Sequence, residues 1–167
     1  MSLNFEFVVK DGRWDAEQLS NMGAMLAVVL SDHLILPDMA SAVVMACNDS
    51  TIQQLNKNFR GKAHPTNVLS WPSTELASKI PGQAPRLATD AELGDIAIAF
   101  ETCTGEAHKA NCPIINHFTH LLLHATLHLL GYDHIQDTDA ELMEQIEVDV
   151  LAKLGICNPY ETRVATQ

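Results

Sequence analysis

The stretch His124-Ala-Thr-Leu-His128-Leu-Leu-Gly131-Tyr-Asp-His134 combines three imidazoles with one glycine at a fixed spacing. His124 and His128 are four residues apart, so a helix of about 3.6 residues per turn places both rings on one face. Gly131 can adopt the left-handed conformation that ends a helix, which lets the chain turn back and present His134. Three neutral histidines leave a fourth tetrahedral position for water, as in catalytic zinc sites. The spacing therefore predicts a hydrolytic metal site.

The segment that carries this motif is predicted to be the central, buried helix of the fold, because apolar residues lie on most of its sides. It opens at Pro113 and includes Ile114, Ile115, Phe118, Leu121, Leu122, Leu127 and Leu130. His117 and His120 precede the motif on the same helix. We expect them to pack or to orient a ligand rather than to bind the metal, although a longer metal-binding histidine stripe is the alternative.

Hydrophobic periodicity predicts the elements around this helix. Strands are expected over residues 3–9, 41–47, 66–71 and 93–100, and helices over 14–30, 50–60, 101–111 and 138–154. Asp15 with Gln18, and Thr138 with Glu141, have capping-box spacing. The last helix has an apolar stripe of Leu142, Ile146, Val150 and Leu154. The order indicates an α+β fold, a mixed β-sheet of about four strands packed with about five helices, in one domain over residues 1–167.

Residues 73–92 stand apart in composition. They contain Pro81, Gly82 and Pro85 among small and polar residues, with no aromatic side chain. A stretch of this length without a periodic pattern is typical of a disordered insertion or a functional lid. We expect a flexible loop.

Composition narrows the class of protein. Hydrophobic residues make up 47% and charged residues 19%, as in a soluble globular chain. The four cysteines include no C-x-x-C pair, which favours a reducing cytosol over a disulfide framework. The longest apolar run, residues 22–30, is too short to cross a bilayer, and no secretory signal precedes the first strand. We expect a cytoplasmic protein without a membrane segment.

The net charge of −11 weakens general affinity for nucleic acids, which comes mainly from Lys and Arg. The charge is unevenly distributed, however. Residues 135–152 contain six acidic residues and no Lys or Arg, whereas Lys57, Arg60 and Lys62 crowd together beside His64. One basic corner on an acidic body permits a localised phosphate contact.

The histidine spacing also matches the ligand pattern of metzincin proteases. Those enzymes carry a glutamate directly after the first histidine as general base. Here that position is Ala125, and a methyl group cannot accept a proton. A metallopeptidase is therefore the less favoured alternative.

Further motifs precede the histidines in a characteristic order, namely Leu55-Asn56-Lys57-Asn58-Phe59-Arg60, Thr66-Asn67-Val68-Leu69-Ser70 and Leu93-Gly94-Asp95-Ile96. Together with Leu127 to His134, they make the chain resemble the YbeY family of bacterial rRNA maturation endoribonucleases over most of its length. Ala125 stands where the family usually has Gly, and Trp71 where Phe is commoner. The first change keeps a small residue and the second keeps an aromatic ring.

The resemblance implies a zinc-dependent, single-strand-specific endoribonuclease that acts in 3′-end maturation of small-subunit rRNA and in ribosome quality control. It implies that the three motif histidines bind one zinc ion and that Arg60 is catalytic. Its implied partners are single-stranded RNA, rRNA of the small ribosomal subunit, and ribosomal proteins or an assembly GTPase, with no role on DNA. A zinc-stabilised ribosome-assembly factor without catalysis remains an alternative, because an acidic surface suits a basic partner. Nickel, cobalt or iron also suit three imidazoles.

A physical argument also supports a catalytic role for Arg60, independently of the resemblance. A guanidinium can hold two non-bridging oxygens of a phosphodiester as charge builds on them, whereas a helix-end Arg that only faces the dipole contributes about 0.3–1 kcal/mol. The expected attack is by metal-bound hydroxide, and attack by the ribose 2′-hydroxyl stays open. Asp133 is expected to orient a ligand or only to shape the turn. Asp95 and residues 67–70 are expected to line the cleft or to play ordinary strand roles.

Overall fold

The computed structural model describes residues 3–161 and contains four strands and five helices in that range. In chain order these are β1 (Asn4–Val9), α1 (Ala16–His33), β2 (Ser41–Cys47), α2 (Asp49–Arg60), β3 (Val68–Pro72), β4 (Glu92–Ala99), α3 (Phe100–Lys109), α4 (Ile114–Leu129) and α5 (Asp137–Lys153). The predicted α+β fold is confirmed.

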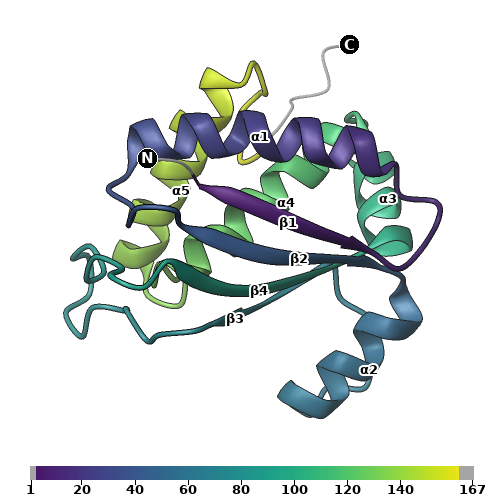
Figure 1. Cartoon of the computed structure of the whole chain (residues 1–167), viewed down its shortest axis with the longest axis horizontal. Coiled ribbons are helices and arrows are strands. Elements are labelled where there is room, and N and C mark those ends of the chain that lie inside the picture. The colour runs from purple at the N-terminus through teal and green to yellow at the C-terminus, as the bar shows by residue number, and fades with distance from the viewer. Residues whose placement is uncertain (1–2, 162–167) are drawn as a thin grey trace.

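The four strands form one mixed sheet in the order β1-β2-β4-β3 (Figure 1). β1 pairs parallel with β2, and β2 parallel with β4, whereas β3 runs antiparallel to β4. Successive side chains of a strand point to opposite faces of the sheet, so alternate residues of β4 pack into different clusters. Ile96 and Ile98 pack into the larger core, while Ala97 and Ala99 pack into a smaller cluster.

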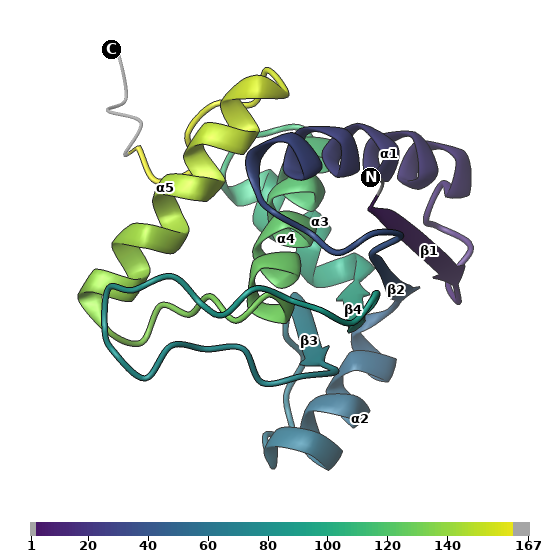
Figure 2. The same cartoon turned by 60° about the vertical axis from the view of Figure 1, so that its left-hand side comes forward.

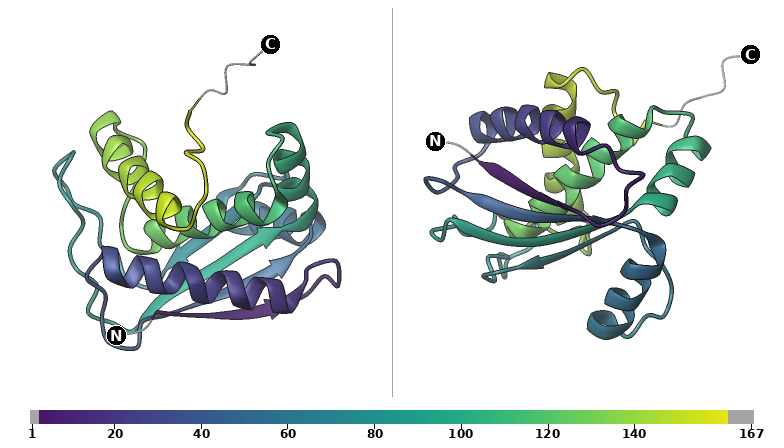
Figure 3. Two further views of the ribbon diagram at one scale, coloured as in Figure 1. Left: turned by 90° about the horizontal axis from the view of Figure 1, so that it is seen from above. Right: turned by 45° about the vertical axis from the view of Figure 1, so that its right-hand side comes forward.

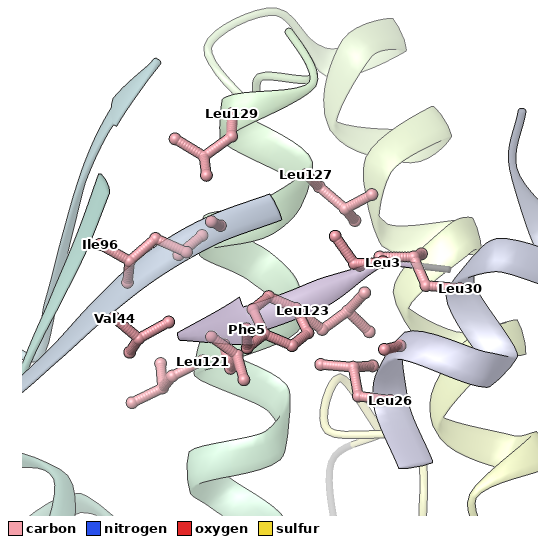
Figure 4. Close-up of a cluster of buried hydrophobic side chains, with 14 of the residues drawn as sticks. Leu3, Phe5, Leu26, Leu30, Val44, Ile96, Leu121, Leu123, Leu127 and Leu129 are labelled. Atoms are coloured by element: carbon pink, nitrogen blue, oxygen red, sulfur yellow. The ribbon is translucent and has the colours of Figure 1, made fainter. Parts of the chain in front are cut away.

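The larger core lies between one face of the sheet and the helices α1, α4 and α5. Figure 4 shows how Leu26 and Leu30 of α1 approach Leu123 and Leu127 of α4 beside the strands. α4 also packs against β3, β4, α1, α3 and α5, so it is the central helix that its apolar sequence predicts. Its burial fixes the direction in which its histidines project.

The opposite face of the sheet is covered by α2 over the β3–β4 side. Ile52 of α2 is fully buried there against Leu69 and Ala97. α2 extends away from the sheet on the side opposite to α1 (Figure 3, right). The basic corner at the end of α2 and the histidines on α4 therefore belong to elements on different faces of the sheet.

The ends of α1 and α5 can be compared with the capping boxes predicted from the sequence. Asp15 accepts a hydrogen bond from the Gln18 amide at 3.0 Å, so one half of that capping box forms and α1 begins at Ala16. The box predicted at Thr138 is wrong, since α5 begins one residue earlier, after Gln136, without a side-chain cap. The predicted stripe is confirmed in part: Ile146 and Val150 are buried and Leu154 packs against the core, but Leu142 is only half-buried, and the other buried residues of α5 are Met143, Glu147 and Leu151.

The long connection between β3 and β4, residues 73–91, contains no helix or strand. It reaches across to the start of α5 (Figure 2), where the Gly82 amide donates to Asp139 Oδ1 at 2.7 Å. Leu76 is buried, and its carbonyl accepts from the Arg86 amide at 2.9 Å. The flexibility expected of this segment stays a prediction. None of the helices in the described range is both long and apolar enough to span a bilayer.

Candidate metal centre

The three motif histidines converge on one point. His124 and His128 project from one face of α4, and their ring centroids are 4.6 Å apart. His134 follows the end of the helix, and its ring centroid lies 5.3 Å from that of His124 and 5.2 Å from that of His128. One nitrogen of each ring lies within 4.8 Å of the others, so the group could hold a metal ion.

Hydrogen bonds at the far side of two rings define which nitrogen faces the centre. His124 Nδ1 lies 2.6 Å from Glu147 Oε1, and His128 Nδ1 lies 2.9 Å from the Tyr132 carbonyl oxygen. Because a carboxylate and a carbonyl only accept, both Nδ1 atoms carry the proton and donate it. With both rings neutral, the Nε2 lone pairs of His124 and His128 then face each other.

That arrangement fits a divalent cation. The two Nε2 atoms are 3.1 Å apart, close to the separation of about 3.3 Å that two ligands about 2.0–2.1 Å from a tetrahedral zinc would have. Two lone pairs aimed at one point repel unless a positive charge lies between them. His134 is exposed, so the third ring leaves one side of the group accessible from solvent.

Electrostatics also favours ligation at His128. Its burial lowers the pKa of the ring to about 4, with further lowering by His124 and His134 against opposing effects of Asp133 and the Tyr132 carbonyl. The ring is therefore neutral at neutral pH, which is the form that binds a metal.

Glu147 of α5 is the member of this site that the sequence analysis missed. Its side chain is fully buried. Burial alone would raise its pKa, but hydrogen bonds from His120, His124 and Tyr160 outweigh that effect and lower the pKa to about 2. The sequence carried no clear signal of this role, because Glu147 lies in the acidic run of residues 135–152 and outside the predicted apolar stripe, and only the structure places it among the buried residues of α5.

The two earlier histidines of α4 contact carboxylates. His120 Nε2 lies 3.3 Å from Glu147 Oε2, so His120 contacts the residue that holds His124. His117 Nε2 lies 3.0 Å from Glu106 Oε1, a carboxylate that also accepts from the Asn67 side chain at 3.0 Å. Through Glu106, His117 ties α4 to α3 and to the residue before β3, and its ring centroid lies 6.4 Å from that of His120.

The turn after α4 depends on Gly131 and Asp133. Gly131 has a φ of +96°, a backbone conformation that residues other than glycine rarely adopt. The Asp133 carboxylate accepts from the His134 amide at 2.7 Å, which stabilises the local turn. No contact between Asp133 and a histidine ring is recorded in the described part of the chain, so the geometry gives Asp133 a turn-shaping contact.

Arg60 and Asp95 are not brought into contact with the histidines. Arg60 is exposed as the last residue of α2, and within residues 3–161 no hydrogen bond or ion pair joins it to the three rings. Asp95 is exposed and alternates with Ile96, so it points to the sheet face away from α4. Both residues thus lie on the α2 side of the sheet.

Comparison with known proteins shows that the chain is similar in sequence to one family over most of its length. Residues 9–155 match the family model described as Endoribonuclease YbeY. A protein of that name from Paracoccus denitrificans is 48% identical, with 93% of this chain and 88% of the relative covered. The one from Cereibacter sphaeroides is 46% identical, with 93% of this chain and 97% of the relative covered. The one from Jannaschia sp. is 44% identical, with 95% of this chain and 100% of the relative covered.

A solved structure has a similar fold. The solution structure of TM1509 from Thermotoga maritima matches with a TM-score of 0.58 and 19% identity, covering 98% of this chain and 100% of the other. This similarity supports the arrangement of one mixed sheet and its helices.

Proposed function

The chain belongs to the endoribonuclease YbeY family, and from this premise we propose that it is a metal-dependent endoribonuclease that cleaves single-stranded RNA. The observation that carries the proposal is the convergence of His124, His128 and His134, with the Nε2 atoms of His124 and His128 3.1 Å apart. An RNA-cleaving hydrolase needs a means to activate an attacking hydroxyl and to stabilise a phosphorane-like charge. The three rings could bind a metal ion that activates the hydroxyl and stabilises this charge.

His124, His128 and His134 would hold one zinc ion per chain. A zinc ion supplies Lewis-acid catalysis when bound, polarising a phosphoryl oxygen and lowering the pKa of water toward ~7. The residues of the chain provide the orientation: Glu147 and the Tyr132 carbonyl keep two rings in one tautomer. The exposed His134 side leaves room for a phosphodiester to approach.

Arg60 is proposed to be catalytic through its positive charge. Within the described range, no ion pair neutralises Arg60 or its neighbours Lys57 and Lys62, so their charge remains available to phosphate. A guanidinium that meets the non-bridging oxygens would stabilise the charge that grows on them during cleavage. Because the structure leaves Arg60 out of contact with the histidines, this role requires the RNA to span both groups.

The preference for single strands is supported by an aromatic side chain beside Arg60. Phe59 is 64% exposed, and its ring meets that of Trp71 edge to face with centroids 5.4 Å apart. Exposed aromatic rings next to cations bind unpaired nucleotides, because bases stack on the ring while phosphates meet the charge. A duplex has its bases already stacked and offers no such contact.

We assign the substrate to rRNA of the small ribosomal subunit, with 3′-end maturation and ribosome quality control as the process and ribosomal proteins or an assembly GTPase as partners. The support is the family membership together with the acidic α5, which suits basic partners. The cytoplasm is the proposed compartment, and the four free cysteines accord with a reducing environment.

The test is cleavage of matched substrates by the purified chain loaded with zinc. We expect products from a single-stranded RNA, far fewer from the same sequence in a duplex, and none from casein. Chelation should stop cleavage, and added zinc should restore it. Cleavage of casein would favour a metallopeptidase instead. A folded, zinc-loaded chain that never cleaves RNA would favour the assembly-factor alternative, and RNA cleavage that persists in His128→Ala would contradict the metal site.

A further inference from the structure

Glu147 is the only carboxylate among residues 3–161 whose side chain is fully buried. Moving an ionised carboxylate out of water costs several kcal/mol unless partners compensate. An apolar residue at this position of α5 would pack against α4 at no such cost. The buried charge therefore indicates a requirement other than packing.

The partners of Glu147 occupy both of its oxygens. Oε1 accepts from His124 Nδ1 at 2.6 Å, a charge-assisted distance. Oε2 accepts from the hydroxyl of Tyr160 and lies 3.3 Å from His120 Nε2. Only one of these three donors, His124, belongs to the metal-binding group, so Glu147 connects that group to two residues outside it.

Tyr160 reaches Glu147 from the segment that follows α5. This segment, residues 154–161, returns over the helix so that the Tyr160 ring meets the His120 ring edge to face at 5.6 Å between centroids. Burial and the hydrogen bond to Glu147 raise the pKa of Tyr160, so its hydroxyl keeps the proton that it donates. Tyr160 thereby holds the carboxylate through Oε2, the oxygen that His124 does not contact.

A second metal site at His120, His124 and Glu147 is the competing interpretation, since their ligand atoms also lie within 4.8 Å of one another. The distances argue against it. Ligand atoms on one tetrahedral zinc lie about 3.3 Å apart, whereas His124 Nδ1 and Glu147 Oε1 are 2.6 Å apart, as in a strong hydrogen bond.

We infer that Glu147, held by Tyr160, is a positioning residue that fixes the His124 ring and its tautomer so that Nε2 faces His128 and His134. The inference rests on the metal site of the proposed function. A histidine that donates its other N–H to a carboxylate binds metal more strongly, and loss of such a partner typically costs about 10- to 100-fold in metal affinity.

The experiment measures cobalt(II) affinity, by competition with a chelator, together with the visible absorption of the bound ion. Glu147→Gln keeps the size of the side chain but removes its charge, and we expect affinity to fall about 10- to 100-fold with a changed cobalt spectrum. Glu141→Gln is the matched control, because Glu141 is an exposed acid of the same helix. We expect it to change affinity less than about twofold.

Tyr160→Phe provides a second variant that keeps the ring and removes only the hydroxyl. We expect a smaller loss of cobalt affinity in the same direction, and this variant decides the matter if Glu147→Gln does not fold. A purely structural role would lower the unfolding stability of the metal-free variants while leaving the cobalt affinity and spectrum of the folded protein at the Glu141→Gln values. That result would overturn the inference.

Failure of the proposed function has a different signature. If the unaltered chain does not bind cobalt with one ion per chain, or if His128→Ala binds it equally well, the metal site itself is wrong and this inference falls with it. If the unaltered chain binds one ion and His128→Ala does not, an unchanged Glu147→Gln refutes the positioning role alone.

Discussion

Gly131 packs directly against the backbone of Leu76, in the connection between β3 and β4. A Cβ atom added at Gly131 would lie 2.8 Å from the carbonyl carbon of Leu76 and 2.9 Å from the amide nitrogen of Ala77. Gly131 also has a φ of +96°. The turn that presents His134 is therefore constrained twice, by its own backbone conformation and by a neighbouring segment more than fifty residues earlier in the chain.

Gly131→Ala should destabilise the protein by about 2–5 kcal/mol. The left-handed conformation costs a residue with a Cβ about 1–2 kcal/mol, and forcing a methyl group against backbone atoms adds about 1–3 kcal/mol. The measurement is the midpoint of denaturant unfolding, monitored by circular dichroism.

Gly155→Ala is the control for this prediction. Gly155 has a φ of +75° at the end of α5, but an added Cβ would meet nothing within 4 Å. Its substitution should cost only the backbone component, about 1–2 kcal/mol. Equal losses in the two variants would show that contact with Leu76 contributes nothing.

The fold was predictable because its signals are local. The central position of α4 follows from an apolar sequence on most sides of one helix, and the start of α1 follows from Asp15, whose side chain accepts from the Gln18 amide at 3.0 Å. The convergence of three histidines was predictable for the same reason, since one helix and one glycine turn position all of them.

The remaining features of the site depend on contacts between distant elements. Glu147 reads as one acid in an acidic run, and only the packing of α5 on α4 places it 2.6 Å from His124. The start of α5 was misplaced because its N-cap, Gln136, makes no side-chain capping bond and so leaves no capping signal in the sequence. The placement of Asp95 depends on which face of β4 meets α4, and the sequence of the strand, apolar on both faces beyond Asp95, does not reveal it.

His134→Ala should sharply lower the metal content of the purified protein. Two imidazoles on α4 would remain, and a site that loses one of three protein ligands binds zinc far more weakly. Elemental analysis of protein dialysed against dilute zinc gives the number of ions per chain. We expect about one in the unaltered protein.

His117→Ala is the matched control for His134→Ala. It removes an imidazole from the same helix, but one that pairs with Glu106 at 3.0 Å rather than with the three motif rings. Its metal content should stay at the unaltered value. Full occupancy in His134→Ala would mean that the third ligand is misassigned.

Arg60→Ala should separate metal binding from catalysis. Arg60 is exposed and makes no recorded contact with the histidines within residues 3–161, so metal content and helicity should not change. RNA cleavage should fall by about 100-fold or more, the usual cost of removing one donor that stabilises developing charge. Single-turnover cleavage of a labelled single-stranded RNA measures the loss.

Arg13→Ala serves as the control for charge alone. Arg13 pairs with Asp11 and Glu101, both at 2.9 Å, so acidic partners already neutralise its charge. Its loss changes the net charge as Arg60→Ala does, and RNA cleavage should stay within about threefold of the unaltered rate. Loss of bound metal in Arg60→Ala would refute a purely catalytic role for this residue.

From the burial of two thiols we predict how the free energy of unfolding changes at alkaline pH. Burial raises the pKa of Cys47 to about 11 and that of Cys103 to about 12, from a value of 9.0 for a free thiol. The folded protein therefore retains protons that the unfolded chain releases above pH 9, and by linkage its stability falls as pH rises from 9 toward 12. The stabilising contribution is fully present below pH 9.

Denaturant unfolding at pH 8 and at pH 10.5 measures this effect, and the Cys47→Ala, Cys103→Ala double variant is the reference. The unaltered protein should lose more stability between the two pH values than the double variant, because the two share every other titrating group. A thiol reagent at pH 8 should modify the exposed Cys157 rapidly, and should reach Cys47 and Cys103 only after denaturant is added. Equal pH dependence of the two proteins, or rapid modification of all the thiols in the folded state, would contradict the burial of Cys47 and Cys103.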